Sequence, residues 1–263
     1  MTTIIDLPER HEQSYFVCLE DWSPEMIEAG DLKRDWYAEA KQHGLRVKVA
    51  VDDSDQPLGM VQYVPIEEGP AEGTGLFMVL CIWVHGHDKG VGDVQRRGIG
   101  SALLDAAEDD ARDLGATGMV AWGLRIPAWM RASWFKKHGY RPADNQGVRQ
   151  LVWKPFTPDA EPPRWVPVRP IAEGEADKVT VTAFRNGWCP ASNLVFERAR
   201  KAAEELGERV VFVTIDVADK KDLVHYGHTD GVFVDGKPIQ RGAPPSYGTI
   251  KKKMEKRLQR LSR

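Results

Sequence analysis

Apolar positions in the first half of the chain follow two different spacings. Runs at residues 45–51, 58–64, 79–84 and 117–122 have the length and composition of strands. After Ser101 the apolar residues recur at helical spacing, with aspartates between them. These helical positions are Leu103, Leu104, Ala107, Ala111 and Leu114. The pattern therefore predicts a strand, a glycine-containing loop and a helix in direct succession.

The loop between that strand and that helix is Gln95-Arg96-Arg97-Gly98-Ile99-Gly100. Free amides and the dipole at a helix N-terminus favour an anion, and two glycines let the backbone approach a pyrophosphate. The loop lacks the Gly-Lys-Ser/Thr ending of a Walker loop. Leu103 occupies the place of the third glycine in the dinucleotide fingerprint, so neither nucleotide motif fits.

The remaining Q-x-x-G-x-G arrangement resembles the GNAT superfamily of N-acetyltransferases. Segment 129–140 is similar to the family's fourth helix and the turn after it, with a small residue, an aromatic pair and Gly139-Tyr140. The resemblance covers residues 1–155 and implies an α/β acetyltransferase fold with a mixed central sheet. It implies that acetyl-CoA is the co-substrate and that an amine of a small molecule or peptide attacks its thioester directly. The cofactor-binding residues that it implies are Ile82, Trp83, Val84, Gln95, Arg96, Arg97, Gly98, Ile99, Gly100 and Ser101.

Two departures from that family affect the expected mechanism. Phe135 stands where many members have a tyrosine that protonates the departing thiolate, so another acid or water must supply that proton. The connection between residues 84 and 98 is longer than usual. We expect this connection to be a flexible loop over the acyl or substrate site.

Other residues near the expected cleft leave alternatives open. His85, His87 and Asp88, with Cys81 nearby, have the composition of a metal site, but we expect no metal there. Cys81 is a candidate acetyl contact, or a buried and inert packing residue. The general base is not identified. The following residues are candidate substrate contacts: the carboxylates Glu20 and Asp21, and the cleft-bordering Trp83, Trp122, Trp129 and Trp134.

Six prolines in residues 155–170 predict an extended linker, which we place at 156–176. Beyond it, residues 177–263 alternate between strand and helix patterns. The expected elements are strands at 179–184, 210–217, 232–234 and 238–240 and helices at 191–206, 219–226 and from 245. This order resembles the thioredoxin fold and implies a smaller, thioredoxin-like α/β domain. The two-domain arrangement resembles acetyltransferases with a C-terminal YoaP-like domain.

Cys189 is the candidate catalytic residue of this second domain. It lies at a predicted helix N-terminus, where the dipole favours a thiolate. Ser192 replaces the second cysteine of the dithiol motif, and Thr229-Asp230 stands where a cis-proline is usual. An internal disulfide through position 192 is therefore excluded. A mixed disulfide with a thiol partner, a ligand-positioning thiol and a binding module with a retained cysteine remain open.

Composition restricts the function further. The 263 residues carry a net charge of −3, and the basic residues of the last helix fall between its apolar positions as on a solvated outer face, so we expect no nucleic-acid partner. No apolar run approaches the length of a membrane span, and the first residues lack a basic start followed by an apolar block, so we expect neither a membrane span nor a secretory signal. Three scattered cysteines make no disulfide framework, which predicts a cytoplasmic protein. The alternative function is a thiol-dependent redox or binding protein in which acyl-CoA is regulatory or absent.

Overall fold

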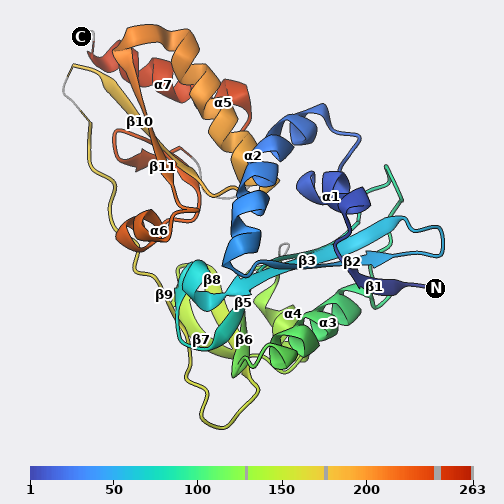
Figure 1. The fold of residues 1–263 in the computed structure, drawn as a ribbon. Helices are drawn as coiled ribbons and strands as arrows, with labels where there is room; N and C mark the ends of the chain where they lie inside the picture. Colours follow the sequence, from blue (N-terminus) through green and yellow to red (C-terminus); the bar gives the residue numbers. More distant parts are fainter. Residues whose placement is uncertain (128–129, 175–176, 240–243, 262–263) are drawn as a thin grey trace. The chain divides into compact units, whose positions relative to one another are not determined.

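The computed structural model describes residues 1–127, 130–174, 177–239 and 244–261. Trp129 and Gln240, which the sequence places in a helix and a strand, lie outside these residues. The chain forms two compact units. The first comprises residues 1–27 and 37–166, and the second comprises residues 28–36 and 167–263. Each unit is built on its own sheet (Figure 1).

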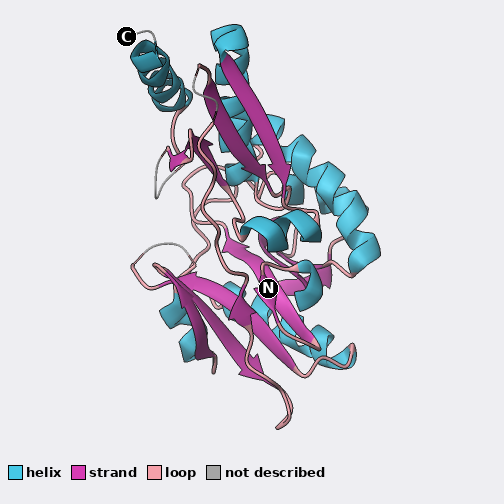
Figure 2. Ribbon diagram, turned by 90° about the vertical axis from the view of Figure 1, so that its left-hand side faces the viewer, coloured by secondary structure: helices cyan, strands magenta, loops and turns pink. Residues whose placement is uncertain are grey.

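The first unit is built on a seven-stranded mixed sheet in the order β1-β2-β3-β5-β6-β8-β7. Only β5 and β6 are parallel, and all other neighbours are antiparallel. This arrangement confirms the α/β fold with a mixed sheet (Figure 2). Its strands are β1 (Thr3–Asp6), β2 (Arg46–Val51), β3 (Pro57–Pro65), β5 (Leu76–Val84), β6 (Gly118–Leu124), β7 (Arg141–Gln146) and β8 (Arg149–Pro155), with a separate pair of β4 (Ala71–Glu72) and β9 (Arg164–Trp165).

Four helices precede or follow these strands. They are α1 (Glu9–Phe16), α2 (Pro24–Ala40), α3 (Ile99–Asp113) and α4 (Ala132–Lys137), with short 3₁₀ turns at η1 (Lys41–His43) and η2 (Ile66–Glu68). The N-terminus of α2 is capped by Ser23, whose Oγ accepts a hydrogen bond from the Met26 amide, and Pro24 occupies the first turn.

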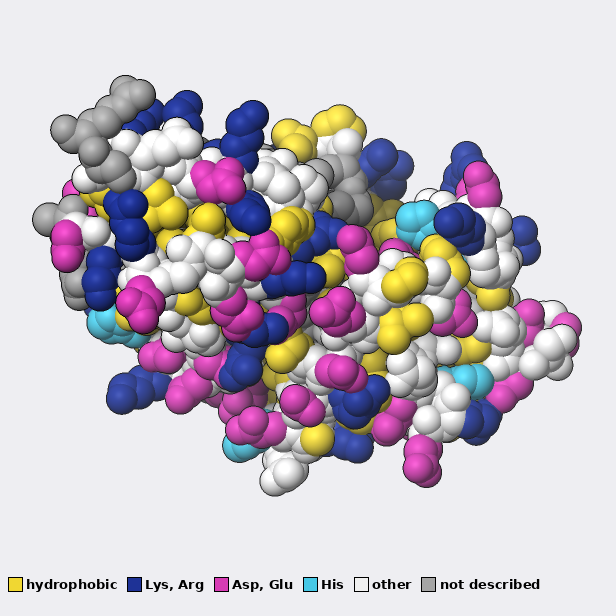
Figure 3. Space-filling view, turned by 90° about the horizontal axis from the view of Figure 1, so that it is seen from above, with side chains coloured by type: hydrophobic (Ala, Val, Ile, Leu, Met, Phe, Trp, Pro, Cys, Tyr) yellow, Lys and Arg dark blue, Asp and Glu magenta, His cyan; other side chains and the backbone are white. Residues whose placement is uncertain are grey.

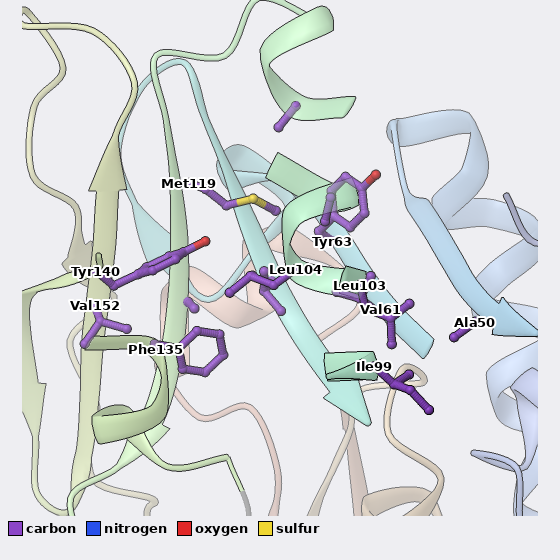
Figure 4. Close-up of a cluster of buried hydrophobic side chains, with 14 of the residues drawn as sticks. Ala50, Val61, Tyr63, Ile99, Leu103, Leu104, Met119, Phe135, Tyr140 and Val152 are labelled. Carbon is purple, nitrogen blue, oxygen red and sulfur yellow. The ribbon is translucent and has the colours of Figure 1, made fainter. Parts of the chain in front are cut away.

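Helix α3 packs its apolar stripe on the sheet, because residues three and four apart share one helix face. It begins at Ile99, two residues before the predicted start, since the Ile99 side chain is buried in the same core. Figure 4 shows Ile99, Leu103 and Leu104 of α3 gathered with Val61 and Met119 from the sheet.

Strands β5 and β6 are paired over only part of their lengths. Their pairing covers Leu76 to Met78 and ends there, although β5 continues to Val84 and β6 to Leu124. On the other side, the pairing of β5 with β3 skips Leu80, which makes a β-bulge. Among the residues that the structure describes, segment 79–84 of β5 therefore pairs with β3 on one side and with no strand on the side of β6.

The second unit has a four-stranded sheet in the order β11-β10-β12-β13. Strands β10 and β11 are parallel, while β12 is antiparallel to both β10 and β13. Helices α5 and α7 supply Phe196, Ala199, Ile250 and Met254 to its core. In chain order its elements are β10 (Val179–Arg185), α5 (Pro190–Leu206), η3 (Gly207–Arg209), β11 (Val210–Asp216), α6 (Lys220–Tyr226), β12 (Gly231–Val234), β13 (Lys237–Pro238) and α7 (Tyr247–Leu261).

Residues 28–36 of α2 belong to the second unit, which the sequence does not predict. Leu32 packs against its core, and the Trp36 and Trp188 ring centroids are 6.2 Å apart. Gly187 allows this approach: a Cβ there would lie 2.4 Å from the Trp36 Cβ, and its φ is +75°. In the described parts of the chain, no helix is both long and apolar enough to span a membrane.

Candidate functional site

The N-terminus of α3 has the backbone geometry that the sequence predicts for an anion site. Gly98 is the N-cap residue, with a φ of +81° that favours glycine. The amides of Ile99, Gly100 and Ser101 lie in the first turn, where the helix itself offers no carbonyl to bind them. The helix dipole adds positive potential at this end.

Gln95 braces the loop that leads to this helix. Its side-chain Nε2 donates a hydrogen bond to the Val84 carbonyl at 3.2 Å, and its backbone amide donates to the Asp93 carboxylate at 2.9 Å. A Cβ at Gly86 would lie 2.1 Å from the same Nε2, so a side chain at residue 86 would displace the Gln95 amide from this position. Gln95 thus holds the loop against the end of β5 through its side chain.

Arg96 and Arg97 extend from the loop. The Arg96 side chain is 90% exposed, and its guanidinium is 3.6 Å from the Asp93 carboxylate. Arg97 donates to the Asp93 carbonyl at 3.2 Å. Both cations therefore contact Asp93 while remaining open to solvent.

Val84, Gly100 and Trp134 meet where β5, α3 and α4 come together. A Cβ on Gly100 would lie 3.4 Å from the Trp134 ring and 3.7 Å from the Val84 side chain. The His138 Nδ1–H donates to the Trp134 carbonyl at 2.9 Å, so its Nε2 accepts from the Ser101 hydroxyl at 2.8 Å. His138 was not predicted as a site residue, and the sequence carries no signal for it apart from its place before Gly139.

The end of β5 presents different side chains on its two faces. Ile82 and Val84 pack against the α3 core, while Trp83 points to the opposite face because side chains alternate along a strand. The Trp83 Nε1 is buried without a hydrogen-bond partner among the described residues. Cys81 is half-buried two positions earlier.

His85 anchors the connection that follows β5. Its side chain is completely buried, and its Nδ1–H donates to the Gly92 carbonyl at 2.7 Å. Its backbone amide donates to Leu58, and its carbonyl accepts from Val94. The connection is thus held by hydrogen bonds near its start, at His85, and near its end, at Gly92 and Val94.

The turn between α1 and α2 packs against that connection. Trp22 lies with its ring centroid 5.0 Å from that of His85 and 5.8 Å from that of His87. Gly90 permits this packing, because a Cβ there would be 2.5 Å from the Trp22 ring. The Glu20 carboxylate is 3.3 Å from the His87 Nε2. The sequence names Glu20 but gives no sign of its pairing with His87.

A cavity of about 160 Å³ lies beside this turn. It is lined by Ser14, Leu19, Asp21, Trp22, Gln56, Pro57, Gly90 and Val91. Asp21 therefore borders the cavity, while Glu20 pairs with His87. Over the described residues, no three or more His, Cys, Asp or Glu side chains are grouped in a way that would hold a metal ion.

Phe135 is a core residue. Its side chain is completely buried, and its ring lies 4.9 Å from Trp134 and 5.5 Å from Tyr140 between centroids. Figure 4 shows Phe135 close to Val152, Leu104 and Tyr140. Burial raises the pKa of Tyr140 well above its usual value, so this phenol stays protonated in the neutral pH range.

Cys189 is the N-cap residue of α5 and is half-buried. Its amide donates to the Asn186 side-chain oxygen at 3.1 Å, and the Asn186 Nδ2 donates to the Thr229 carbonyl at 2.9 Å. Asn193 closes the same loop by donating to the Gly187 carbonyl at 2.8 Å. Asn186 thus joins the Cys189 segment to the segment before β12.

This mixed sheet, with a diverging parallel strand pair and a glycine loop at a helix start, has the architecture that the sequence predicts for an acetyltransferase fold. The family model "Acetyltransferase (GNAT) family" matches residues 6–140. The chain belongs to the acetyltransferase (GNAT) family. Membership confirms the prediction of an N-acetyltransferase that depends on acetyl-CoA.

Solved structures of GNAT proteins are similar to this chain. A GNAT-family acetyltransferase from Desulfovibrio desulfuricans is 18% identical, covers 60% of this chain and 100% of its own, and has a TM-score of 0.46. The PaiA N-acetyltransferase of Thermoplasma acidophilum, in complex with coenzyme A, is 16% identical, covers 59% and 99%, and has a TM-score of 0.45. A Brucella melitensis GNAT acetyltransferase, in complex with acetyl-CoA, is 17% identical, covers 62% and 92%, and has a TM-score of 0.42. No curated protein matches the chain.

Proposed function

We propose that the first unit transfers acetyl from acetyl-CoA to an amine of a small molecule or peptide by direct attack. The observation that carries this proposal is the divergence of β5 from β6 beyond Met78 and Val120, next to the first turn of α3. Parallel strands end at the same edge of a sheet, and the α3 amides follow the end of β5 through one loop. An unpaired strand edge and an anion-binding helix start therefore share one side of the sheet.

Two groups of residues are proposed to bind acetyl-CoA. The backbone of Ile82, Trp83 and Val84 is proposed to bind the acetyl carbonyl and the pantetheine arm, because this edge of β5 pairs with no strand in the described parts of the chain. The segment Gln95–Ser101 is proposed to bind the pyrophosphate through the free amides of α3. Arg96 and Arg97 supply charge from the solvent side, and Gln95 acts by holding the loop in place.

In the proposed reaction the amine nitrogen forms a bond to the thioester carbon, and the carbon–sulfur bond then breaks. No acyl-enzyme is needed. The CoA thiolate takes its proton from solvent, since Phe135 has none to give and is buried in the core. The cavity of about 160 Å³ beside Trp22, which Asp21 borders, is proposed to take part of a small acceptor.

For the second unit we propose a thioredoxin-like module built on residues 177–263, on which residues 28–36 of α2 also pack, after a linker at 156–176; the rest of residues 1–155 is the proposed acetyltransferase domain. Its strand order, with one parallel pair and two antiparallel pairs, supports this assignment. Cys189 at the N-cap of α5 supports a thiol that forms a mixed disulfide with a partner. A redox or binding protein with this thiol is the second candidate function.

Two further properties belong to this proposal. Three free cysteines support a reducing, cytoplasmic location. On the face seen in Figure 3, Lys and Arg side chains are interspersed with Asp and Glu, so this face is not a uniformly basic surface of the kind that binds nucleic acid.

Calorimetry with acetyl-CoA and a thiol-release assay with a panel of amines test the proposed function. The panel comprises simple amines, aminoglycosides, amino acids and peptides. Acetyl-CoA at 100 times its dissociation constant should stabilise the fold by about 2.7 kcal/mol. Binding without thiol release on any amine would overturn the transferase proposal and favour the thiol-dependent alternative.

A further inference from the structure

Acetyl transfer to an amine requires a group that accepts a proton. An alkylamine in water is mostly in its protonated ammonium form at neutral pH. Its nitrogen must lose a proton before it can attack the thioester. The reaction proposed above leaves this group unassigned. A proton acceptor must lie near the end of β5 and reach the space open to the acceptor.

His87 lies at this position. It follows β5 by three residues, and His85 between them is fixed by its bonds to Gly92, Leu58 and Val94. The His87 ring packs beside Trp83, with the centroids 6.0 Å apart, and beside Trp22. Since Trp83 occupies the face of β5 opposite Ile82 and Val84, His87 approaches the strand from the side that α3 does not cover.

The environment of His87 gives its two ring nitrogens different roles. Nε2 is 3.3 Å from the Glu20 carboxylate, and a carboxylate in this position favours the tautomer with the proton on Nε2. Nδ1 then carries a lone pair, and it has no partner among the described residues. The His87 side chain is 48% exposed, while that of Glu20 is 25% exposed. The nitrogen that can accept a proton is therefore accessible, and the carboxylate that orients the ring is partly sheltered.

Other titratable groups nearby are less suited to this role. His85 is completely buried, and its Nδ1–H donates a hydrogen bond to the Gly92 carbonyl. The Tyr15 hydroxyl donates to Gln62 inside the core. Asp21 and Trp22 both line the small cavity, and the Trp22 ring also packs beside His87. Asp21 is therefore better placed to contact the acceptor than to take its proton.

We propose that His87 is the general base of the transfer and that Glu20 is its positioning residue; this rests on the proposed function. His87 Nδ1 takes a proton from the ammonium form of the acceptor, and the neutral nitrogen then forms the new carbon–nitrogen bond. The second proton of that nitrogen leaves to solvent as the amide forms. The electron pair on the carbonyl oxygen then restores the double bond, and the carbon–sulfur bond breaks to release CoA thiolate. The proton on His87 passes to solvent, so the charge and proton count balance over one turnover.

The test uses the full chain with acetyl-CoA and two probe nucleophiles. Benzylamine is mostly protonated at neutral pH and needs a base, whereas hydroxylamine is mostly unprotonated and does not. His87→Gln should lower kcat with benzylamine by about 100-fold or more, and with hydroxylamine by less than about fivefold. Glu20→Gln should cause a smaller loss, about tenfold. The matched control is His43→Gln, which changes an exposed histidine on η1.

A further variant separates proton transfer from structure. His87→Ala should regain part of its benzylamine activity when imidazole is added, and Glu20→Gln should not. Acetyl-CoA affinity, measured by calorimetry, should stay within about twofold of wild type in every variant.

The outcomes distinguish this inference from the function on which it rests. If the wild-type protein turns over and the His87→Gln variant keeps more than half of the wild-type kcat, the inference is overturned and the transferase function stands. Equal losses with both nucleophiles, without imidazole rescue, also overturn it, because they indicate a structural role. If benzylamine is not accepted, the variants are assayed with the best amine of the panel. Absence of thiol release with any nucleophile overturns the proposed function itself, and the inference with it.

Discussion

The Gln95 side-chain amide donates a hydrogen bond to the Val84 carbonyl at 3.2 Å and so ties the glycine loop to the end of β5. Both residues belong to the segments assigned to the cofactor, and eleven positions of the chain separate them. Because the bond joins the strand end to the loop before α3, it fixes the distance between the two proposed halves of the acetyl-CoA site.

Removal of this bond should weaken cofactor binding. Gln95→Ala should raise the acetyl-CoA dissociation constant about fivefold to tenfold, since one net hydrogen bond contributes about 1 kcal/mol and the loop loses its anchor. Gly86→Ala should act in the same direction, because its Cβ would displace the Gln95 side chain. Calorimetry measures both effects, and an unchanged affinity in both variants would contradict the bracing role.

Gly100 provides a graded test of the same region. A Cβ there makes only ordinary contacts with Trp134 and Val84, so Gly100→Ala should keep the fold. Gly100→Val adds two methyl groups near the Trp134 ring and should weaken acetyl-CoA binding strongly, by about tenfold or more. The measurement is calorimetric, with circular dichroism as the check on folding. Equal affinity of the Gly100→Val variant and wild type would remove Gly100 from the proposed site.

Phe135→Leu tests whether this ring acts only in packing. The substitution replaces a completely buried ring by a smaller side chain and should cost about 1 to 3 kcal/mol of stability through lost packing. Turnover should fall only modestly, because the buried ring has no proton to give. A loss of several orders of magnitude in kcat with normal acetyl-CoA binding would refute this interpretation.

Asp110 of α3 is the centre of a polar network. Arg46 donates two hydrogen bonds to it, at 2.8 and 2.6 Å, and the Tyr63 hydroxyl donates a third at 2.7 Å. Burial alone would raise the pKa of Asp110, but hydrogen bonds from Arg46, Tyr63 and Lys48 lower it from 3.8 to about 2. A lowered pKa in the folded state adds stability above pH 3.8, and this stability is lost as the pH falls from there toward 2.

Asp110→Asn should therefore destabilise the protein by about 2 kcal/mol at neutral pH, since Arg46 loses its ionised partner. The variant should lose less stability than wild type between pH 4 and pH 2. Thermal unfolding across that range measures both effects. Asp109→Asn is the matched control, because its carboxylate is 77% exposed and pairs only at the surface with Arg112. Parallel pH profiles of the Asp110→Asn variant and wild type would count against the network.

Cys189 should react with iodoacetamide faster than Cys18 or Cys81, because only Cys189 lies at the N-terminus of a long helix. Oxidation should give a mixed disulfide with glutathione, since Ser192 cannot resolve it. Peptide mass mapping after timed labelling measures the three rates. If Cys189 reacts no faster than the other two, the second unit is better described as a binding module.

Most helices and strands could be predicted because their apolar periods are local properties of the sequence. The strand at 79–84 and the helix after the glycine loop are examples, and the helix start at Ile99 differs only because Ile99 joins the core. The bulge at Leu80 could not be predicted, since it depends on the register between β5 and β3. The pairing of Glu20 with His87 joins residues far apart in the chain, and neither local sequence indicates it.

The assignment of residues 28–36 to the second unit has a consequence for dividing this protein. The chain crosses between units after residues 27, 36 and 166, so cutting it in the proline-rich segment does not yield two self-contained halves. A fragment that ends at residue 155 would carry Leu32 and Trp36 without the apolar surface they cover. The complementary fragment would expose Trp188 to solvent. Both fragments should aggregate more readily than the whole chain, and mixing them should restore solubility if residues 28–36 pack again on the second core.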